Sequence, residues 1–213
     1  MPLVSVIINC YNGSRDLPAC FDCLRRQTFT DFEIVFLDNC SEDDSAKIAQ
    51  SFGPKLRYFK SPHNVPLGAA RNLALQEAKG DLIAFLDCDD LWLEDKLARQ
   101  VDLMQKDPDI GLVTCDTILS DGHKELGRVF TGSPPARGFA FAELVERQWI
   151  SMSSAMVSRK ALASLTSASG EWVSGWFDET LNVCEEADVF YRIAYNWKID
   201  YVEEPLAVWR IHG

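Results

Sequence analysis

The sequence lacks any apolar run near the roughly 20 residues that a membrane-spanning helix needs. It is also short of basic charge, because 21 Lys and Arg stand against 32 Asp and Glu, for a formal net charge of -11. That balance argues against a nucleic-acid backbone or an anionic membrane surface as the main partner. Met1-Pro2-Leu3 leads into a strand-like segment with no basic leader before it. We therefore expect a cytoplasmic protein without a membrane span.

A metal-binding cysteine pattern is missing as well. The chain has 7 cysteines, an odd number, and Cys10, Cys88 and Cys115 lie in or just after apolar runs, where a free thiol acts as a small hydrophobe. Cys20 and Cys23 form a CxxC pair, but a structural zinc needs four ligands and no second pair follows at suitable spacing. The cysteines therefore indicate a reducing compartment.

Short apolar runs alternate with helical periods in the first half of the chain. Residues 3–8, 32–37 and 82–86 are rich in β-branched or aromatic types and too short for typical helices, so they are predicted to be buried strands. The first intervening helix is expected behind Ser14 or Asp16 as its cap, and Ser41 is expected to open the second. This βαβ alternation predicts an α/β fold, an open and mostly parallel sheet flanked by helices.

The pattern changes near residue 120, and residues 122–138 show no period, which predicts a long loop or mobile arm. A single domain is expected over 1–213, with one half at 1–119 and a smaller half at 120–213. The further helices are expected near 68–79, 94–106, 139–147 and 185–196, and the further strands at 56–59, 111–115, 154–157, 200–203 and 207–211.

Polar side chains follow three of the predicted strands, at the edge where ligands bind in open α/β sheets. Asn9 to Gly13 follow the first strand, Asp38 the second, and the acidic run Asp87-Cys88-Asp89-Asp90 the third. Carboxylates so close together repel one another, and an oxygen-rich site of this kind suits Mg²⁺ or Mn²⁺ with positions left for phosphate oxygens. The alternative is that Asp89 and Asp90 cap a following helix.

At these residues the chain resembles the family 2 glycosyltransferases with the nucleotide-sugar-binding GT-A fold, a Rossmann-like sheet with an acceptor-side second half. The resemblance covers most of the chain. It is carried by VSVIINCYN (4–12), LDNCSEDDS (37–45), NVPLGAARN (64–72) and FLDCDD (85–90), the last of which supplies the DxD motif, and it continues in SGWFDE (174–179) and CEEADVFYR (184–192).

The resemblance implies a donor site at the end of the first two strands. Asp38 would bond the nucleobase, and Asn9, Tyr11 and Asn12 would lie against the donor. Arg71, in the first turn of its helix, would meet a phosphate or form a salt bridge with the DxD segment, and a purely structural ion pair is the competing interpretation.

The resemblance also implies the metal and diphosphate contacts. Asp87 would approach the ribose or the metal, and Asp89 would ligate the Mg²⁺ or Mn²⁺ that bridges the diphosphate. Arg210 and His212 lie in a segment, VWRIHG, whose Arg and His can face the diphosphate or the metal. Because the sequence ends one residue after His212, we expect further helices beyond it in the natural protein.

The catalytic base is implied by the family's Glu-Asp-x-Asp segment, whose second acidic residue corresponds to Glu186. This chain has Glu where Asp is usual, so Glu185 remains a rival. Otherwise Glu185, Glu186 and Asp188 are ordinary acids in the first turn of a helix.

The function implied is metal-dependent, inverting transfer of a sugar from a nucleotide diphosphate sugar to an acceptor hydroxyl, in polysaccharide or glycolipid biosynthesis. UDP is the expected donor nucleotide, and a saccharide or lipid-linked acceptor is the expected second substrate. Such an acceptor would bring the protein to the inner face of the membrane. The alternative is an inactive nucleotide-binding or docking module of the same fold.

Overall fold

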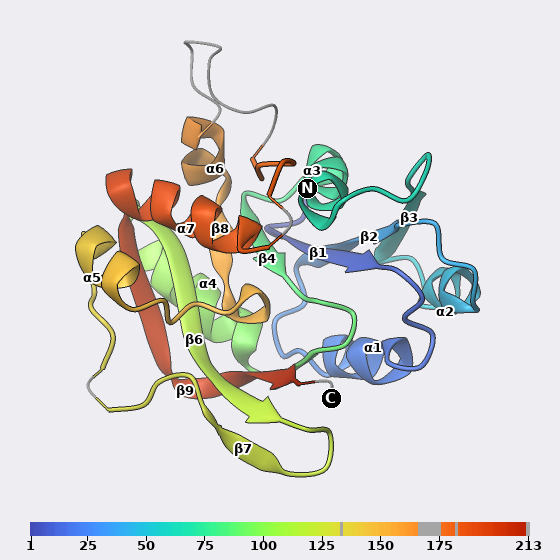
Figure 1. The fold of residues 1–213 in the computed structure, drawn as a ribbon, viewed down its shortest axis with the longest axis horizontal. Helices are drawn as coiled ribbons and strands as arrows, with labels where there is room; N and C mark the ends of the chain where they lie inside the picture. Colours follow the sequence, from blue (N-terminus) through green and yellow to red (C-terminus); the bar gives the residue numbers. More distant parts are fainter. Residues whose placement is uncertain (133, 166–175, 182, 212–213) are drawn as a thin grey trace.

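In the computed structural model, residues 1–132, 134–165, 176–181 and 183–211 are described, and they form one mixed sheet with helices on both faces (Figure 1). The strands are β1 Val4–Cys10, β2 Phe32–Asp38, β3 Leu56–Lys60, β4 Leu82–Phe85, β5 Leu91–Trp92, β6 Ile110–Ser120, β7 Glu125–Arg128, β8 Met156–Ser158 and β9 Lys198–Arg210. The helices are α1 Leu17–Arg25, α2 Ser45–Gln50, α3 Leu67–Glu77, α4 Lys96–Lys106, α5 Phe141–Glu146, α6 Arg159–Leu165 and α7 Glu185–Asn196, with a 3-10 turn at Met152–Ser154.

The parallel part of the sheet is built around β1, which pairs with β2 on one side and β4 on the other. Cys10 at the end of β1 lies opposite Asp38 at the end of β2, and Ile7 lies opposite Phe85 at the end of β4. Because the three strands run in the same direction, their polar continuations emerge at one edge of the sheet. The expected α/β architecture is confirmed in this half.

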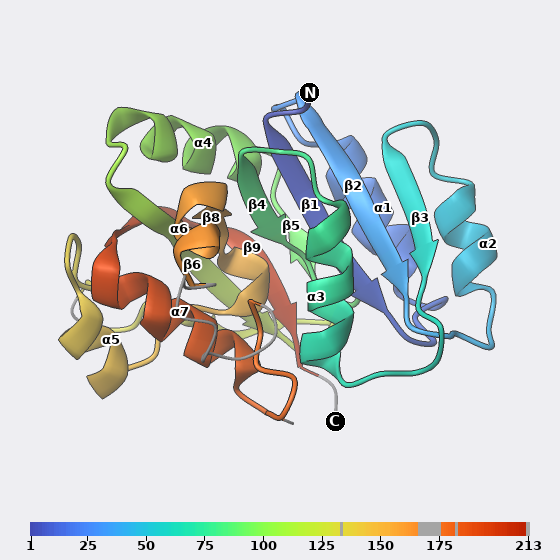
Figure 2. The same ribbon diagram turned by 90° about the horizontal axis from the view of Figure 1, so that it is seen from above.

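Each face of the sheet has its own apolar core. Successive residues of a strand point to opposite faces, so Val6 and Ile8 pack with α1, α2 and α4, whereas Ile7 packs with α3, α5, α6 and α7. Figure 2 shows these two helical layers with the sheet between them. The strand order is β3-β2-β1-β4-β8-β6-β9-β5, with β7 beside β6.

The second half differs from the prediction at β7, at β9 and at α6, a helix that the sequence did not predict. Residues 122–138 are not all loop, because β7 forms a hairpin with β6; its Leu126 is half exposed, so no buried alternation marked the strand. The two strands predicted at 200–203 and 207–211 are one strand, β9. A register shift against β6 around Pro205 takes up the irregularity, as proline in a sheet commonly requires.

One helix start was predicted wrongly, and a second helix starts where expected, behind Asp16, but without the expected side-chain cap. α2 begins at Ser45 rather than Ser41, and the side chain of Asp16, which precedes α1, makes no capping hydrogen bond. Strands β4, β8, β6 and β9 are joined in one sheet, so elements from before and after residue 120 share it. The division of labour between these two halves stays a prediction.

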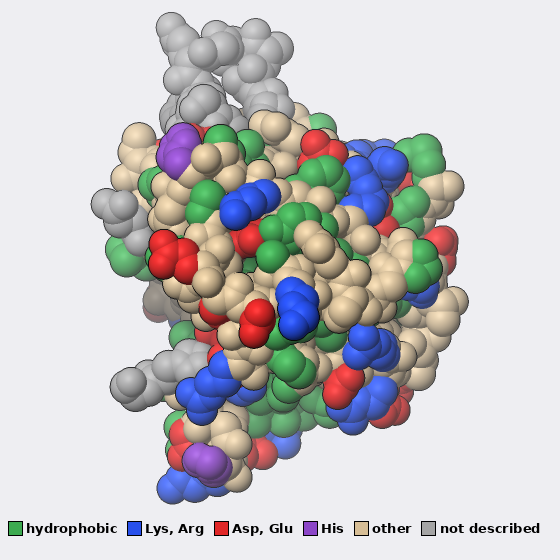
Figure 3. Space-filling model, turned by 90° about the vertical axis from the view of Figure 1, so that its right-hand side faces the viewer, with side chains coloured by type: hydrophobic (Ala, Val, Ile, Leu, Met, Phe, Trp, Pro, Cys, Tyr) green, Lys and Arg blue, Asp and Glu red, His purple; other side chains and the backbone are tan. Residues whose placement is uncertain are grey.

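The surface carries both signs of charge. On the face seen in Figure 3, acidic and basic side chains are interspersed rather than gathered into a patch of one sign. Among the described residues, no helix combines the length and apolar character required to cross a membrane.

Candidate active site

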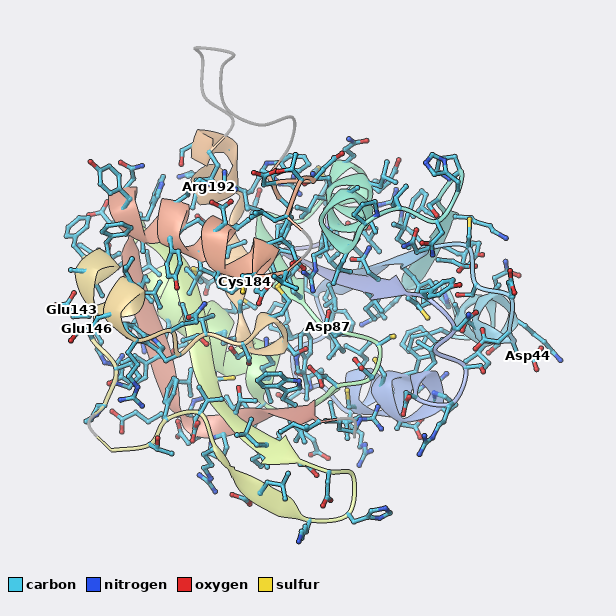
Figure 4. The ribbon with its side chains drawn as sticks, viewed as in Figure 1. Asp44, Asp87, Glu143, Glu146, Cys184 and Arg192 are labelled. Carbon is cyan, nitrogen blue, oxygen red and sulfur yellow. The ribbon has the colours of Figure 1, made fainter. Side chains whose placement is uncertain are left out.

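Arg71 of α3 links two acidic segments that are far apart in the sequence. Its guanidinium is buried, and it forms an ion pair of 3.2 Å with Asp87 Oδ1 and a second, shorter one with Glu185 Oε1. Asp87 follows β4, whereas Glu185 is the first residue of α7. Figure 4 shows Asp87 near the end of α7 that follows Cys184. α3 begins at Leu67, so Arg71 lies in the second turn rather than the first.

The acidic run after β4 is held in place by main-chain and hydroxyl donors. Ser153 Oγ donates to Asp90 Oδ2 at 2.5 Å and accepts from the backbone N–H of Asp87 at 3.1 Å. The N–H of Arg210 donates to Asp90 Oδ1 at 2.9 Å. Burial, and then the charge of Asp87, raise the pKa of Asp90 to about 7. The capping alternative is wrong for both acids, because β5 follows Asp90 and the next helix begins only at Lys96.

Arg210 supports the same run from the α1 side. Its Nε donates to the carbonyl of Asp89, and its Nη1 lies 3.2 Å from Asp16 Oδ1. Its Nη2 is buried and has no partner among the described residues. The side chain of Asp16, expected to cap α1, thus serves instead as an ion-pair partner. Contact between Arg210 and a diphosphate stays a prediction, and His212 lies outside the described residues.

Asp38, at the end of β2, is fully buried. Its Oδ1 accepts from the backbone N–H of Ser41 at 2.7 Å, and its Oδ2 accepts from the Tyr58 hydroxyl at 2.6 Å. Burial and the bond to Asp38 raise the pKa of Tyr58. Both oxygens are therefore bonded within the protein, and the predicted contact of Asp38 with a nucleobase stays a prediction.

The loop after β1 lies beside Asp38. Asn12 has a φ of 54°, a left-handed conformation that Asn tolerates better than most residues, and its Oδ1 accepts from the N–H of Glu42 at 2.8 Å. Its own N–H donates to Ser41 Oγ at 3.0 Å. Tyr11 is 54% exposed, and Asn9 Nδ2 is buried without a hydrogen-bond partner in the described structure. The donor contacts predicted for these three residues stay predictions.

A cavity of about 400 Å³ opens beside the acidic run. Glu186 lines it, and burial, followed by the charge of Glu185, raises the pKa of Glu186. Glu185 is only 5% exposed and is committed to Arg71. The wall also includes Arg71, Asp87, Asp90, Trp149 and Trp209. The predicted base and the predicted metal-binding segment therefore meet at one cavity.

The residues present suit a cation that is held mainly by a substrate's phosphates. Among the described residues, no three His, Cys, Asp or Glu side chains converge to form a metal site. Mg²⁺ commonly needs only one or two protein carboxylates when phosphates complete its shell. Asp87 is 36% exposed at its side chain and uses Oδ1 for Arg71, and Asp89 is also partly exposed. These two carboxylates fit such a cation by their chemistry.

Comparison with known proteins now decides the family. Residues 5–163 match the model of "Glycosyl transferase family 2". The chain belongs to glycosyltransferase family 2. An uncharacterized glycosyltransferase of Methanocaldococcus jannaschii is 30% identical over 220 residues, covering 99% of this chain and 71% of the relative. The family expected from the motifs is thus confirmed.

A relative with a named activity matches a shorter part. WfgD of Escherichia coli, a UDP-Glc:alpha-D-GlcNAc-diphosphoundecaprenol beta-1,3-glucosyltransferase, is 32% identical over 105 residues, which are 49% of this chain and 42% of WfgD. The chain covers only 20% and 33% of two uncharacterized glycosyltransferases, from Rickettsia felis and Rickettsia typhi, that it also matches.

Solved structures confirm the expected GT-A fold. TarS of Staphylococcus aureus in complex with UDP superposes with a TM-score of 0.78 at 21% identity, covering 98% of this chain and 60% of TarS. Mannosyltransferase PcManGT from Pyrobaculum calidifontis, in complex with GDP-Man and Mn²⁺, gives a TM-score of 0.73 at 20% identity over 99% of this chain and 57% of PcManGT.

Two residues that support the candidate site, Ser153 and Tyr58, were not found from the sequence. Ser153, which holds Asp90, carried no local signal because it lies in a short polar segment, Ser151 to Ser154. Tyr58 could have been found from the strand pairing. Lys60 lies opposite Asp38 in the parallel register, and Tyr58, two residues earlier, lies on the same face of β3.

Proposed function

We propose that this glycosyltransferase moves a hexosyl residue from a UDP-sugar to an acceptor hydroxyl, with inversion at the anomeric carbon. The observation that carries the proposal is the meeting of Glu186 with Asp87 and Arg71 at one cavity. A base and diphosphate-binding groups at the same cavity match what displacement of a nucleoside diphosphate needs.

Glu186 is the proposed general base. It takes the proton of the acceptor hydroxyl while that oxygen attacks the anomeric carbon, and the nucleoside diphosphate leaves from the opposite face. Its pKa is raised by burial, and a base works best with a pKa near the working pH. Glu185 is the weaker candidate, because its carboxylate is buried and held by Arg71.

Asp87 and Asp89 are proposed to hold Mg²⁺ or Mn²⁺ in the family's manner. The bound cation would supply positive charge to the departing diphosphate. The Mn²⁺ and GDP-Man in the PcManGT complex support this part of the proposal. Arg71, held between Asp87 and Glu185, keeps the cation-binding segment at a fixed position relative to the base.

UDP is the proposed donor nucleotide, because the TarS complexes contain UDP and UDP-GlcNAc and the name of WfgD specifies UDP-Glc. GDP is the alternative, which PcManGT supports. The diphosphoundecaprenol in the name of WfgD supports a lipid-linked acceptor here as well. Such an acceptor would place the enzyme in the cytoplasm at the inner face of the membrane. The competing function is an inactive module that binds a nucleotide or a partner without turnover.

The test is calorimetric titration of UDP, GDP and dTDP, each with Mn²⁺ and again with EDTA, followed by turnover assays with radiolabelled donors. We expect UDP to bind only with the metal, Asp89→Ala to lose this binding, and Glu186→Gln to keep it but lose turnover. Metal-dependent binding without turnover of any donor would favour the inactive module. Binding of GDP alone would replace the donor assignment.

A further inference from the structure

One side chain of α3 holds the loop of residues 176–179 that leads toward α7. Asn72, next to Arg71, is 3% exposed. Its Nδ2 donates to the carbonyl of Phe177 at 2.9 Å and to Glu179 Oε1 at 3.0 Å. Its Oδ1 accepts from the N–H groups of Trp176 and Phe177 at 3.1 and 2.9 Å. An amide has two donors and two acceptor sites, so all of them are used on this one loop.

The 176–179 loop in turn lies against Arg71. Phe177 is fully buried, and the centre of its ring is 5.5 Å from Arg71 Cζ. The same ring meets Phe85, the last residue of β4, edge to face at 5.8 Å. A Cβ on Gly68 would lie only 3.2 Å from the carbonyl of Asp178, so glycine there lets the loop approach α3 closely. Phe177 thus packs against both Arg71 and the strand that ends before Asp87.

The loop is also tied to α7. Arg192, in the middle of that helix, donates from Nη2 to the carbonyl of Trp176, and from Nε to Asp188 Oδ2 at 2.9 Å. Arg192 is labelled on α7 in Figure 4. The loop is therefore joined to the helix whose first turn holds Glu185 and Glu186.

We propose that Asn72 is a positioning residue for glycosyl transfer. By fixing the 176–179 loop it fixes Phe177 against Arg71, and Arg71 sets where Asp87 lies relative to Glu185 and the neighbouring base, Glu186. This inference rests on the proposed function. Loosening the loop would change the spacing between the base and the diphosphate-binding groups. Neither Asp38 nor Asn12 takes part in these contacts, so the proposed nucleoside-binding site would keep its geometry.

The test exchanges the donor and acceptor of one hydrogen bond. Asn72→Asp keeps oxygens for the N–H groups of Trp176 and Phe177, but it loses both donors and puts a carboxylate against Glu179. Glu179→Gln in the same chain supplies an amide donor and removes the repulsion, so the bond can form with its polarity reversed. Glu179→Gln alone is the matched control for the loop, because its amide oxygen can still accept from Asn72.

We expect Asn72→Asp to lower kcat for transfer about 10- to 100-fold, since small displacements of reacting groups cost rates of this order. The Kd for UDP with Mn²⁺ should stay within about twofold. The double variant should recover part of the lost kcat, because it restores the bond between residues 72 and 179 but not the bond to the Phe177 carbonyl. Hydrogen exchange of peptides covering 176–181 and the start of α7 should be faster in Asn72→Asp, slower again in the double variant, and close to the wild-type rate in the Glu179→Gln control.

Two results would overturn the inference. A double variant no better than Asn72→Asp in both kcat and exchange would show that the bond to Glu179 does not hold the loop. An equal loss of UDP affinity and kcat would show that the substitution disturbs the donor-binding site or the folding of the whole protein. If the wild-type chain neither binds nor turns over a nucleotide, the proposed function fails. In that case hydrogen exchange still tests the inference, because exchange rates unchanged by Asn72→Asp would show that Asn72 does not hold the 176–179 loop.

Discussion

Neutral substitutions of the two adjacent glutamates should separate the structural acid from the base. Glu185→Gln removes the charge that faces Arg71. Both partners of this ion pair are nearly inaccessible, Glu185 at 5% and Arg71 at 3% exposure. Removing one partner of a buried ion pair typically costs about 3–5 kcal/mol. Here Arg71 keeps Asp87 at 3.2 Å, and the new amide oxygen can still accept a hydrogen bond. We therefore expect Glu185→Gln to lower the free energy of unfolding by about 2 kcal/mol.

Glu186→Gln should behave in the opposite way. Burial already disfavours its charge, so neutralising it should change the free energy of unfolding by less than about 0.5 kcal/mol. Its turnover should fall about 100- to 10,000-fold, the range for losing a general base. In a chain of 213 residues, a loss of 2 kcal/mol lowers the Tm by about 4–8 °C.

The assay is thermal unfolding in EDTA together with transfer kinetics on the same preparations. The expected pair of results is a lowered Tm for Glu185→Gln, and a normal Tm with little turnover for Glu186→Gln. A Glu186→Gln enzyme that transfers sugar at the wild-type rate would refute the base assignment. If Glu185→Gln then lost turnover at an unchanged Tm, the two roles would have to be exchanged.

Substitutions at three further residues test the surroundings of the site. A pKa of about 7 for folded Asp90, above the ordinary value, means that unfolding releases its proton; the free energy of unfolding should fall by about 2 kcal/mol from pH 5 to pH 7. Urea unfolding at both pH values should show that Asp90→Asn removes this fall. The same fall in free energy between pH 5 and pH 7 in the wild type and in Asp90→Asn would contradict the prediction. Tyr58→Phe deletes the hydroxyl that binds Asp38 and should weaken UDP binding about tenfold by calorimetry, whereas unchanged affinity would separate Asp38 from the donor seat. Arg210→Met should weaken Mn²⁺-dependent UDP binding more than Arg210→Lys, because the latter keeps a cation near Asp16; equal losses would argue against this ion pair.

The parallel part of the sheet, and the edge where its polar strand ends meet, could be predicted because they follow from local sequence. Buried strands such as β1 and β2 are continuous apolar runs, and parallel pairing brings their ends together whatever the details. Helix α7 was predicted at 185–196 and found at Glu185–Asn196, because its apolar residues repeat at helical spacing. β7 could not be predicted in this way. It is stabilised by its pairing with β6 and buries little of its own side chains.

The sequence motifs predicted which residues lie together at this cavity, but not the contacts between them. Motif order brought Asp87, Arg71 and Glu186 together, yet the ion pair of Arg71 with Glu185 joins residues 114 positions apart. No spacing rule relates such residues, because the contact depends on how α3 and α7 pack on the sheet. The same is true of Arg210 and Asp16, where a residue expected as a helix cap became an ion-pair partner.

The acidic residues of the site can lie close together because their mutual repulsion is reduced in different ways. Asp87 and Glu185 share the one buried guanidinium of Arg71. Asp90, with a pKa raised to about 7, can carry a proton and is held by Ser153 and the N–H of Arg210. Burial raises the pKa of Glu186, and the charge of Arg71 offsets this rise only in part. Since Arg71 offsets only part of this negative charge, a cation brought in with a diphosphate would relieve the repulsion among Asp87, Asp90 and Glu186, whereas a bare diphosphate would add to it.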